Sequence, residues 1–313
     1  MTKCLTLHML ETNFQHKRQQ LDKMTTNAKK NEVIAFTKMH GIGNDYIYIN
    51  CMESTPSRLP ELAREMSDRH KGVGGDGIVL ICPSEVADFR MRMFNNDGSE
   101  ARMCGNASRC IAKYVHDHGL TAKNTINLET LSVIKVLSLN MNGDEVESVT
   151  VDMGVPSLKK ADIPVVVDSE TDEVVQYPLL TPWGEFKVTA VSMGNPHGVI
   201  FVDSIPDIPF DQLGPYLESH PVWPDRANIE FAQILGPSDI LMRVWERGTG
   251  ETLACGTGAC ATAVASALNG FTGKAVTIHL RGGDLQISLA DNGHVMMTGQ
   301  ATEVFQGLYT RQD

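Results

Sequence analysis

Two cysteines in near-copies of one short motif are the residues of this sequence best suited to chemistry. Cys104 lies in the segment EARMCG (residues 100–105), and Cys255 lies in ETLACG (251–256). Each precedes a glycine and a stretch of small residues with helical character. Each thiol is therefore expected at a helix N-terminus, where the macrodipole favours negative charge and lowers the thiol pKa. If the motifs face each other, one thiol can remove a proton from a carbon atom while the other protonates its opposite face.

The spacing of the two motifs recurs elsewhere, which indicates an internal duplication. The cysteines are 151 residues apart. The same offset relates Gly43-Asn44 to Gly194-Asn195, and Asp88, Met91 and Arg92 to Asp239, Met242 and Arg243. A shared offset over separate segments predicts two halves with the same fold.

The two halves differ at three aligned positions. Tyr46 corresponds to His197, Asn95 to Glu246, and Gly77 to Asn228. Taken alone, His197 is typical of a turn histidine and Glu246 of a surface ion pair with its neighbour in sequence. Asparagines at such positions are common turn residues. A functional interpretation of these side chains depends on a site around the cysteines.

Composition and charge narrow the classes of function. At 313 residues the chain is long enough for two ordinary domains, and 42% hydrophobic with 21% charged residues is typical of a soluble globular protein. The formal net charge of −11 disfavours nucleic acid or an anionic membrane as partner. No apolar run approaches the roughly 20 residues of a membrane span. Seven cysteines spread over a long chain favour a reducing compartment, and we expect a cytoplasmic protein.

The apolar and turn patterns predict an α+β fold of two pseudo-symmetric domains, each a mostly antiparallel, barrel-like sheet around a central helix. Residues 1–32 are polar without a clear period, which predicts a flexible extension. The first domain is expected at 33–153, with 298–313 returning to it, and the second at 154–297. One helix is expected at 60–69 and one after each motif cysteine. The acidic, valine-rich stretch 165–176 is expected to form an exposed hairpin.

Two other patterns resemble binding sites, and we reject both. Residues 72–77 (GVGGDG) match the glycine pattern of dinucleotide sites, but a helix precedes them and a strand follows, which is the reverse order. We expect these glycines to let backbone approach a ligand or to form a tight turn. Cys104 with Cys110, and Cys255 with Cys260, lack the spacing of zinc ligands, so no metal is expected. Cys110 and Cys260 are instead expected in the core.

Five segments closely resemble the diaminopimelate epimerase family. They are residues 39–46 (MHGIGNDY), 94–100 (FNNDGSE), 104–106 (CGN), 194–197 (GNPH) and 246–258 (ERGTGETLACGTG). The resemblance covers the chain from near Phe36 to its C-terminus. It implies a homodimer with a site in the cleft between two similar domains of each chain. It also implies interconversion of LL- and meso-diaminopimelate without a cofactor, in the lysine and peptidoglycan pathway.

The resemblance implies a role for each matching residue. Cys104 and Cys255 match the family's thiolate base and thiol acid, and His197 and Glu246 match groups that tune those thiols. The implied substrate-binding residues are Asn44, Asn95, Asn195, Asn228, Glu246 and Arg247, with main-chain contacts from Gly105, Asn106, Gly256 and Thr257. Phe305 stands where relatives have a tyrosine linked to dimer formation, so its ring can pack there but the hydroxyl contact is lost.

Two other functions stay open. A proline racemase-like enzyme of the same superfamily would use the same thiols, but proline has no second polar end for Asn95, Asn195, Asn228 and Arg247 to hold. A redox sensor would use a Cys104–Cys255 disulfide and would need neither Asn228 nor Arg247. Deuterium uptake at the α-carbon of diaminopimelate separates all three functions.

Overall fold

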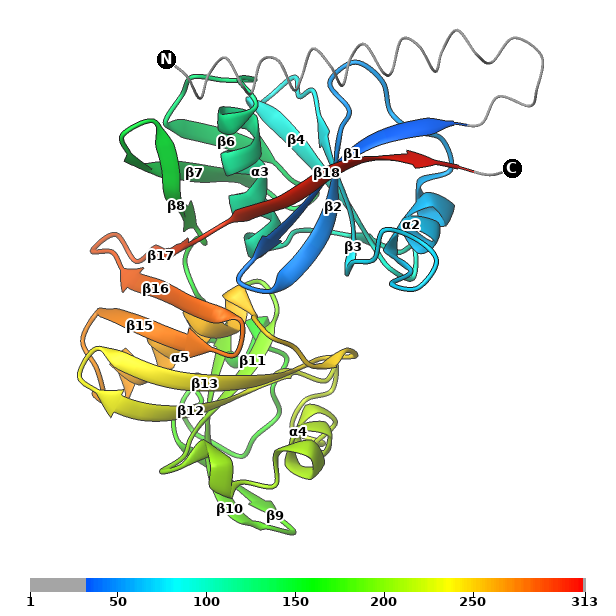
Figure 1. The fold of residues 1–313 in the computed structure, drawn as a ribbon. Helices are drawn as coiled ribbons and strands as arrows, with labels where there is room; N and C mark the ends of the chain where they lie inside the picture. The colour runs from blue at the N-terminus through cyan, green and yellow to red at the C-terminus, as the bar shows by residue number, and fades with distance from the viewer. Residues whose placement is uncertain (1–31, 312–313) are drawn as a thin grey trace, which may run out of the picture. The chain divides into compact units, whose positions relative to one another are not determined.

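The computed structural model describes residues 32–311, and the strands and four α-helices of this range form two repeated arrangements (Figure 1). The predicted extension, residues 1–32, lies outside the described residues except for Glu32. The chain forms two compact units, one of residues up to 35 with those from 308 onward, and one of residues 36–307. The larger unit contains every residue of the expected site. The boundary expected at 153/154 falls inside it and stays a prediction.

The two arrangements repeat one order of elements, except that the second begins with an additional strand, β9. The first half contains β1 (Val33–Gly41), β2 (Asn44–Asn50), α2 (Leu59–Ser67), β3 (Gly77–Cys82), β4 (Phe89–Asn95), β5 (Glu100–Ala101), α3 (Gly105–Asp117), β6 (Thr125–Glu129), β7 (Ile134–Asn142) and β8 (Glu145–Asp152). The second half contains β9 (Tyr177–Thr181), β10 (Gly184–Ser192), β11 (Pro196–Phe201), α4 (Phe210–Glu218), β12 (Asn228–Gly236), β13 (Asp239–Glu246), β14 (Gly250–Glu251), α5 (Gly256–Leu268), β15 (Ala275–Leu280), β16 (Gly283–Leu289) and β17 (Val295–Gly299). The last strand, β18 (Thr302–Thr310), pairs with β1.

Strand pairing follows the duplication residue by residue. In both halves two successive strands are parallel, as β2 with β3 and β11 with β12, and most other pairs are antiparallel. Ile47 lies opposite Ile78, and Gly198 lies opposite Ile229, at the same offset of 151 residues. The halves also share hydrogen bonds, because β17 pairs antiparallel with β8. The predicted pseudo-symmetric α+β fold is therefore confirmed.

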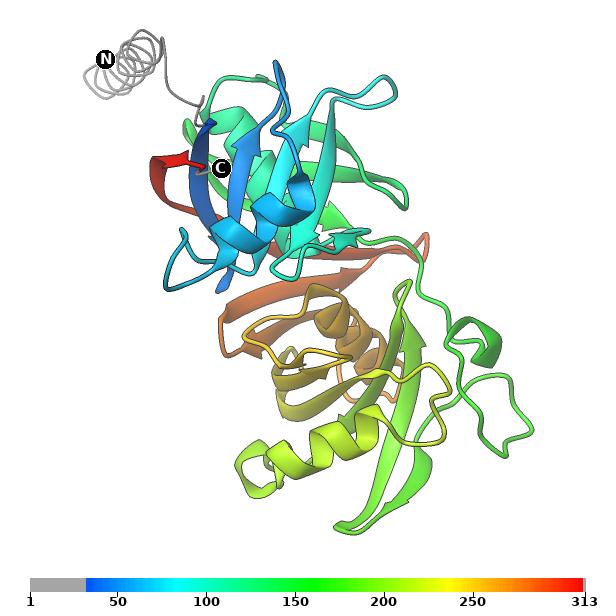
Figure 2. The same ribbon diagram turned by 90° about the vertical axis from the view of Figure 1, so that its right-hand side faces the viewer.

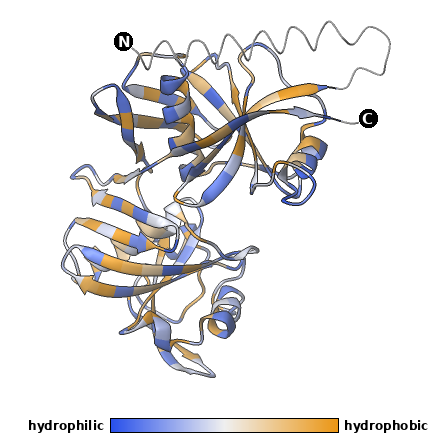
Figure 3. Cartoon of the chain, in the orientation of Figure 1, coloured by the Kyte–Doolittle hydropathy of each residue, from blue (hydrophilic) through white to orange (hydrophobic). Residues whose placement is uncertain are grey.

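Each half encloses one helix. Along β13, buried Ile240, Met242 and Val244 alternate with less buried residues, and Figure 3 shows such hydrophobic and hydrophilic alternation along several strands. These inward residues pack on α5, which contacts β10, β11, β12, β15 and β16. Small side chains let the strands approach, and Ala259, Cys260 and neighbouring alanines are almost fully buried. The helix α3 contacts β2, β7 and β8 in the same way.

Some elements differ from the sequence expectations. The glycine stretch 72–77 joins α2 to β3, which confirms the order helix, glycines, strand. Side chains are excluded there, because a Cβ on Gly77 would lie 2.1 Å from the carbonyl oxygen of Phe94. The expected hairpin at 165–176 is wrong: no strand pair forms within it, and Val165 and Val174 are buried in a second cluster. The sequence patterns also missed α4, which packs against β12 and β13 (Figure 2).

Candidate active site

Both motif cysteines cap their helices, as predicted. Cys104 (φ −141°, ψ 120°) and Cys255 (φ −123°, ψ 108°) have extended backbone, and each helix begins at the glycine that follows. The glutamate that begins each motif is held by an arginine of the preceding long strand. Arg92 Nε donates to Glu100 Oε1 at 2.8 Å, and Arg243 Nε donates to Glu251 Oε1 at the same distance. These two equivalent ion pairs anchor the turns that carry the cysteines.

The starts of α3 and α5 lie close to one residue, Met297 of β17. A Cβ on Gly105 would lie 2.8 Å from Met297 Cε, and a Cβ on Gly256 would lie 2.9 Å from Met297 Sδ. Asn106 Nδ2 also donates to the carbonyl oxygen of Ala254 at 3.4 Å. The two helix N-termini therefore meet at one place, and a side chain at either start would have to displace the end of the Met297 side chain.

A cavity of about 1620 Å³ opens at this place and brings most of the expected site residues together. The expected residues that line it are Asn44, Asn95, Cys104, Gly105, Asn106, Asn195, Glu246, Arg247, Cys255, Gly256 and Thr257. His197 and Asn228 are buried and do not line it. Phe305 lies elsewhere, on β18, with its ring centroid 5.9 Å from that of Phe36.

In the first half, an aspartate orients the asparagine beside Cys104. Asn44 Nδ2 donates to Asp76 Oδ2 at 2.7 Å. Because a carboxylate only accepts hydrogen bonds, the Asn44 carbonyl oxygen must point the other way. It accepts from Cys104 Sγ at 3.4 Å and from Asn106 Nδ2 at 3.3 Å.

In the second half, a longer chain of hydrogen bonds connects Cys255 to a buried carboxylate. Cys255 Sγ lies 3.5 Å from Thr257 Oγ1, which accepts from Asn195 Nδ2 at 3.4 Å. Asn195 Oδ1 lies 3.0 Å from His197 Nε2, and His197 Nδ1 lies 2.7 Å from Glu230 Oε1. The histidine and the glutamate are both fully buried. A Cβ on Gly258 would lie 2.6 Å from Glu230 Oε1, so a side chain here would displace the buried carboxylate from its place beside His197.

The expectation that helix N-termini lower the pKa of both thiols is wrong for this structure. Burial raises the pKa of Cys104, although the N–H groups of Ala107 and Asn106 and the charge of Arg109 oppose this shift. Burial raises the pKa of Cys255 well above its usual range, and the Glu246 and Glu230 carboxylates raise it further. The cost of removing a thiolate from water is thus larger here than the stabilisation that the helix N-terminus gives it. The asymmetry leaves Cys255 holding its proton more firmly.

Glu246 and Arg247 form the second-half rim of the site, and Asn228 lies buried behind them. Burial raises the pKa of the Glu246 carboxyl, which accepts a hydrogen bond from Thr252. Asn228 Oδ1 accepts from the backbone N–H of Arg247 at 3.0 Å, and Asn228 Nδ2 donates to the carbonyl oxygen of Pro196 at 2.9 Å. The exposed Arg247 guanidinium donates from Nη1 to the carbonyl oxygen of Asp225 at 3.1 Å. In this structure Asn228 therefore positions the arginine.

Three residues of this site were missed by the sequence patterns: Asp76, Arg109 and Glu230. Asp76 belongs to the glycine stretch 72–77, whose glycines were interpreted as a turn or a close approach of backbone, with no role for the aspartate. Arg109 and Glu230 lie in segments of mainly apolar or small residues. A single charged residue in such a segment was the signal that could have indicated a buried functional charge. At the offset of 151, the equivalents of Glu230 and Arg109 are the uncharged Val79 and Cys260. A charge present in only one half of a duplication marks a place where the halves have specialised.

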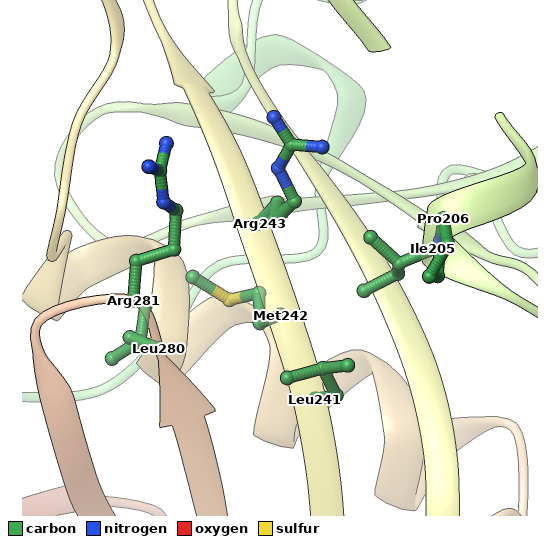
Figure 4. Close-up of a pocket in the computed structure, with 7 residues that line it drawn as sticks. All are labelled: Ile205, Pro206, Leu241, Met242, Arg243, Leu280 and Arg281. Atoms are coloured by element: carbon green, nitrogen blue, oxygen red, sulfur yellow. The ribbon is translucent and has the colours of Figure 1, made fainter. Parts of the chain in front are cut away.

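A second cavity, of about 500 Å³, lies on the second half (Figure 4). Its lining residues are Ile205, Pro206, Leu241, Met242, Arg243, Leu280 and Arg281. Both of its arginines bind Glu251, Arg281 Nη1 at 2.7 Å, and it contains no acid–base pair. We therefore assign the site to the larger cavity. Within residues 32–311 no cluster of His, Cys, Asp or Glu side chains has the arrangement of a metal site. No helix in this range is both long and apolar enough to span a bilayer.

The cavity thus receives one thiol from each half of a duplicated α+β fold. Solved structures share this fold. The phenazine biosynthesis protein of the PhzF family from Bacillus anthracis gives a TM-score of 0.64 at 17% identity, covering 89% of this chain and 99% of that one. A hydroxyproline epimerase from Agrobacterium vitis gives 0.63 at 13% identity, covering 91% and 95%. At such identities the likeness establishes the fold alone.

Sequence relatives identify the family. The model of the family described as diaminopimelate epimerase matches residues 36–159 and 189–304. Proteins named diaminopimelate epimerase are 55% identical in Acetivibrio thermocellus, over 87% of this chain and 97% of the relative, and 51% identical in Pelotomaculum thermopropionicum, over 88% and 98%. A third, from Methanococcus maripaludis, is 50% identical over 87% and 98%. The chain belongs to the diaminopimelate epimerase family.

Proposed function

We propose that this protein interconverts LL- and meso-diaminopimelate by proton transfer between Cys104 and Cys255, without a cofactor. The observation that carries the proposal is the arrival of two thiols, one from each half, at the meeting point of two helix N-termini. The names of relatives with about half of their residues identical support the substrate. The reaction supplies the meso isomer for lysine and peptidoglycan synthesis, and the enzyme acts in the cytoplasm.

The proposed reaction takes a proton from one face of the α-carbon and returns one to the other face. The Cys104 thiolate abstracts the α-proton, and the electron pair of the C–H bond stays on the carbon beside the carboxylate. Cys255 then donates its S–H proton to the opposite face, which leaves Cys104 as thiol and Cys255 as thiolate. The firmer hold of Cys255 on its proton supports this assignment of base and acid. The reverse direction exchanges the two roles.

The developing negative charge needs fixed positive partners, because no cofactor delocalises it. The N–H groups of Gly105, Asn106, Gly256 and Thr257 begin two helices and can bind the α-carboxylate from both sides. Preorganised donors of this kind often supply the largest share of catalysis. His197 and Glu246 support Cys255, the first through Asn195 and Thr257 and the second through its charge.

The distal end of the substrate is assigned to Arg247 with Asn95 and Asn195. Arg247 presents a planar group that can bind both oxygens of a carboxylate. Asn228 acts by fixing the Arg247 backbone. Proline would leave these groups unpaired, which favours diaminopimelate over the fold neighbours' smaller substrates. A redox sensor would need none of them.

The two thiols are expected to titrate differently in the free enzyme. Because alkylation requires thiolate, Cys104 should react with iodoacetamide at lower pH than Cys255. Glu230→Gln removes one negative charge near Cys255, so the pH midpoint of Cys255 alkylation should fall while that of Cys104 changes little. Peptide mass spectrometry after timed alkylation across a pH series measures both midpoints. Equal midpoints in the wild type, or a shift of Cys104 alone in the variant, would contradict the proposed asymmetry.

We also propose that the enzyme is a homodimer through the surface around Phe305. Val304 and Phe305 are 55% and 46% exposed on β18, which is unusual for neighbouring large apolar residues. Replacing Phe305 with aspartate is expected to shift the protein towards monomer in analytical ultracentrifugation. A wild-type protein that sediments as a monomer at micromolar concentration would refute this part of the proposal.

A further inference from the structure

Arg109 of α3 is a fully buried positive charge without an ion-pair partner. Its exposed fraction is 0%, and it is among the largest fully buried side chains. None of the carboxylates in residues 32–311 forms a salt bridge with it, whereas the buried Glu230 is paired with His197. A guanidinium stays protonated in proteins, and burying it unpaired is costly. Such a charge calls for an explanation beyond packing.

The neighbours of Arg109 place it directly beneath the meeting point of the two helices. Arg109 Nη2 donates to Asn106 Oδ1 at 2.9 Å. Asn106 Nδ2 donates in turn to Asn44 Oδ1 and to the carbonyl oxygen of Ala254, the residue before Cys255. Arg109 Nη1 lies 3.8 Å from Met297 Sδ, and Met297 touches both helix starts.

Two glycines make room for the guanidinium. A Cβ on Gly41 would lie 3.1 Å from Arg109 Nη2, and a Cβ on Gly299 would lie 3.1 Å from Nε. The first glycine ends β1 and the second ends β17, so both halves of the fold contribute to the space. The fold therefore builds a specific place for this charge. The equivalent position in the other half, Cys260, is uncharged.

We propose that Arg109 is a positioning residue whose unpaired charge stabilises the anions of the site: the Cys104 thiolate, the substrate carboxylate and the charge that develops beside it. The inference rests on the proposed epimerase function and deepens it. Anions at the helix starts provide the negative charge that balances the Arg109 guanidinium. Arg109 does not touch the substrate, and it acts through its field and through the fixed amide of Asn106.

This role makes predictions that a packing role does not. Arg109→Met keeps an apolar chain in the space, and it should raise the pH midpoint of Cys104 alkylation by about one unit and lower kcat about 100-fold. Arg109→Lys keeps the charge and should retain most of the wild-type midpoint and of kcat. A loss with lysine as complete as with methionine would overturn the proposal.

A relocated charge gives the sharpest test. Met297 touches the guanidinium, so the double variant R109M/M297K returns a positive charge to the same space from β17, and R109M/M297Q is its neutral control. In the lysine double variant, the pH midpoint of Cys104 alkylation should return to its wild-type value. Its kcat should be at least tenfold higher than the kcat of the glutamine control. Equal midpoints and rates in the two double variants would overturn the proposal.

The alkylation readout separates this inference from the proposed function. It needs no turnover, since it follows Cys104 in the full-length free enzyme. A wild type that fails to epimerise diaminopimelate while its Cys104 midpoint still depends on charge at position 109 or 297 would reject the function alone. If the wild type is active but the pH midpoint of Cys104 alkylation does not depend on the charge at position 109 or 297, the role of Arg109 alone is rejected.

Discussion

Replacing either Cys104 or Cys255 with alanine is expected to abolish epimerisation of diaminopimelate while leaving the fold intact. Each thiol serves one face of the α-carbon, so loss of either interrupts the transfer in both directions. Both side chains border the cavity, and although Cys255 also belongs to the buried core, alanine removes only one heavy atom there. Turnover is measured by stereochemical analysis of diaminopimelate, and folding by circular dichroism. Serine at either position should retain a trace of activity, because a hydroxyl can donate a proton but is a poor base near neutral pH.

Cys110→Ala and Cys260→Ala are matched controls on the same two helices. Both thiols are fully buried and lie outside the cavity lining. These variants should lose about 1 kcal/mol of stability from small cavities and keep near wild-type turnover. A Cys104 or Cys255 variant that epimerises as fast as these controls would remove that cysteine from the mechanism.

Replacing Arg247 with methionine is expected to raise KM steeply and to lower kcat as well. Binding energy from the distal carboxylate helps align the reacting carbon, so its loss affects the chemical step. Lysine should rescue only in part, because a point charge cannot reproduce a two-pronged contact. Asn228→Ala should act in the same direction more weakly, since it removes two neutral hydrogen bonds, each worth about 0.5–1.5 kcal/mol. Steady-state kinetics with LL-diaminopimelate measures these effects.

The control for Arg247 uses both a second arginine and a shortened substrate. Arg90→Met removes a charge that pairs with Glu129 outside the cavity lining and should leave kinetics unchanged. With an analogue that lacks the distal carboxylate, wild type should be slow and Arg247→Met should lose little more. If the losses of catalytic efficiency from the variant and from the analogue are fully additive, another residue binds the distal carboxylate.

Much of the fold follows from the spacing of a few residues. The offset between Cys104 and Cys255 predicted a duplication, and the structure extends it to single pairs such as Ile47 with Ile78 and Gly198 with Ile229. Helix starts after the cysteines were predictable because glycine and small residues follow them. The stretch 165–176 was misjudged because Val165 and Val174 pack into a core whose other members are distant in sequence.

The site was less predictable where charges are buried. The thiol pKa shifts depend on burial, which no local pattern reports, and burial outweighs the helix N-termini. Glu230 and Arg109 lie among apolar or small neighbours and become recognisable as site residues only when β12 and α3 are placed beside the cavity. Of their partners, His197 was singled out where the two halves differ in sequence and Asn106 through its place at a helix start, and the family motifs gave both a role.

The most direct test of the central claim is the reaction of LL-diaminopimelate with wild-type enzyme in D₂O, analysed by mass spectrometry at early times. Transfer between two thiols predicts that newly formed meso isomer carries one solvent deuterium at the inverted carbon, while recovered LL isomer stays largely unlabelled. Proline under the same conditions should acquire no label. Unlabelled meso product, or LL isomer that gains deuterium as fast as meso forms, would contradict the proposal that opposed thiols serve opposite faces of one carbon.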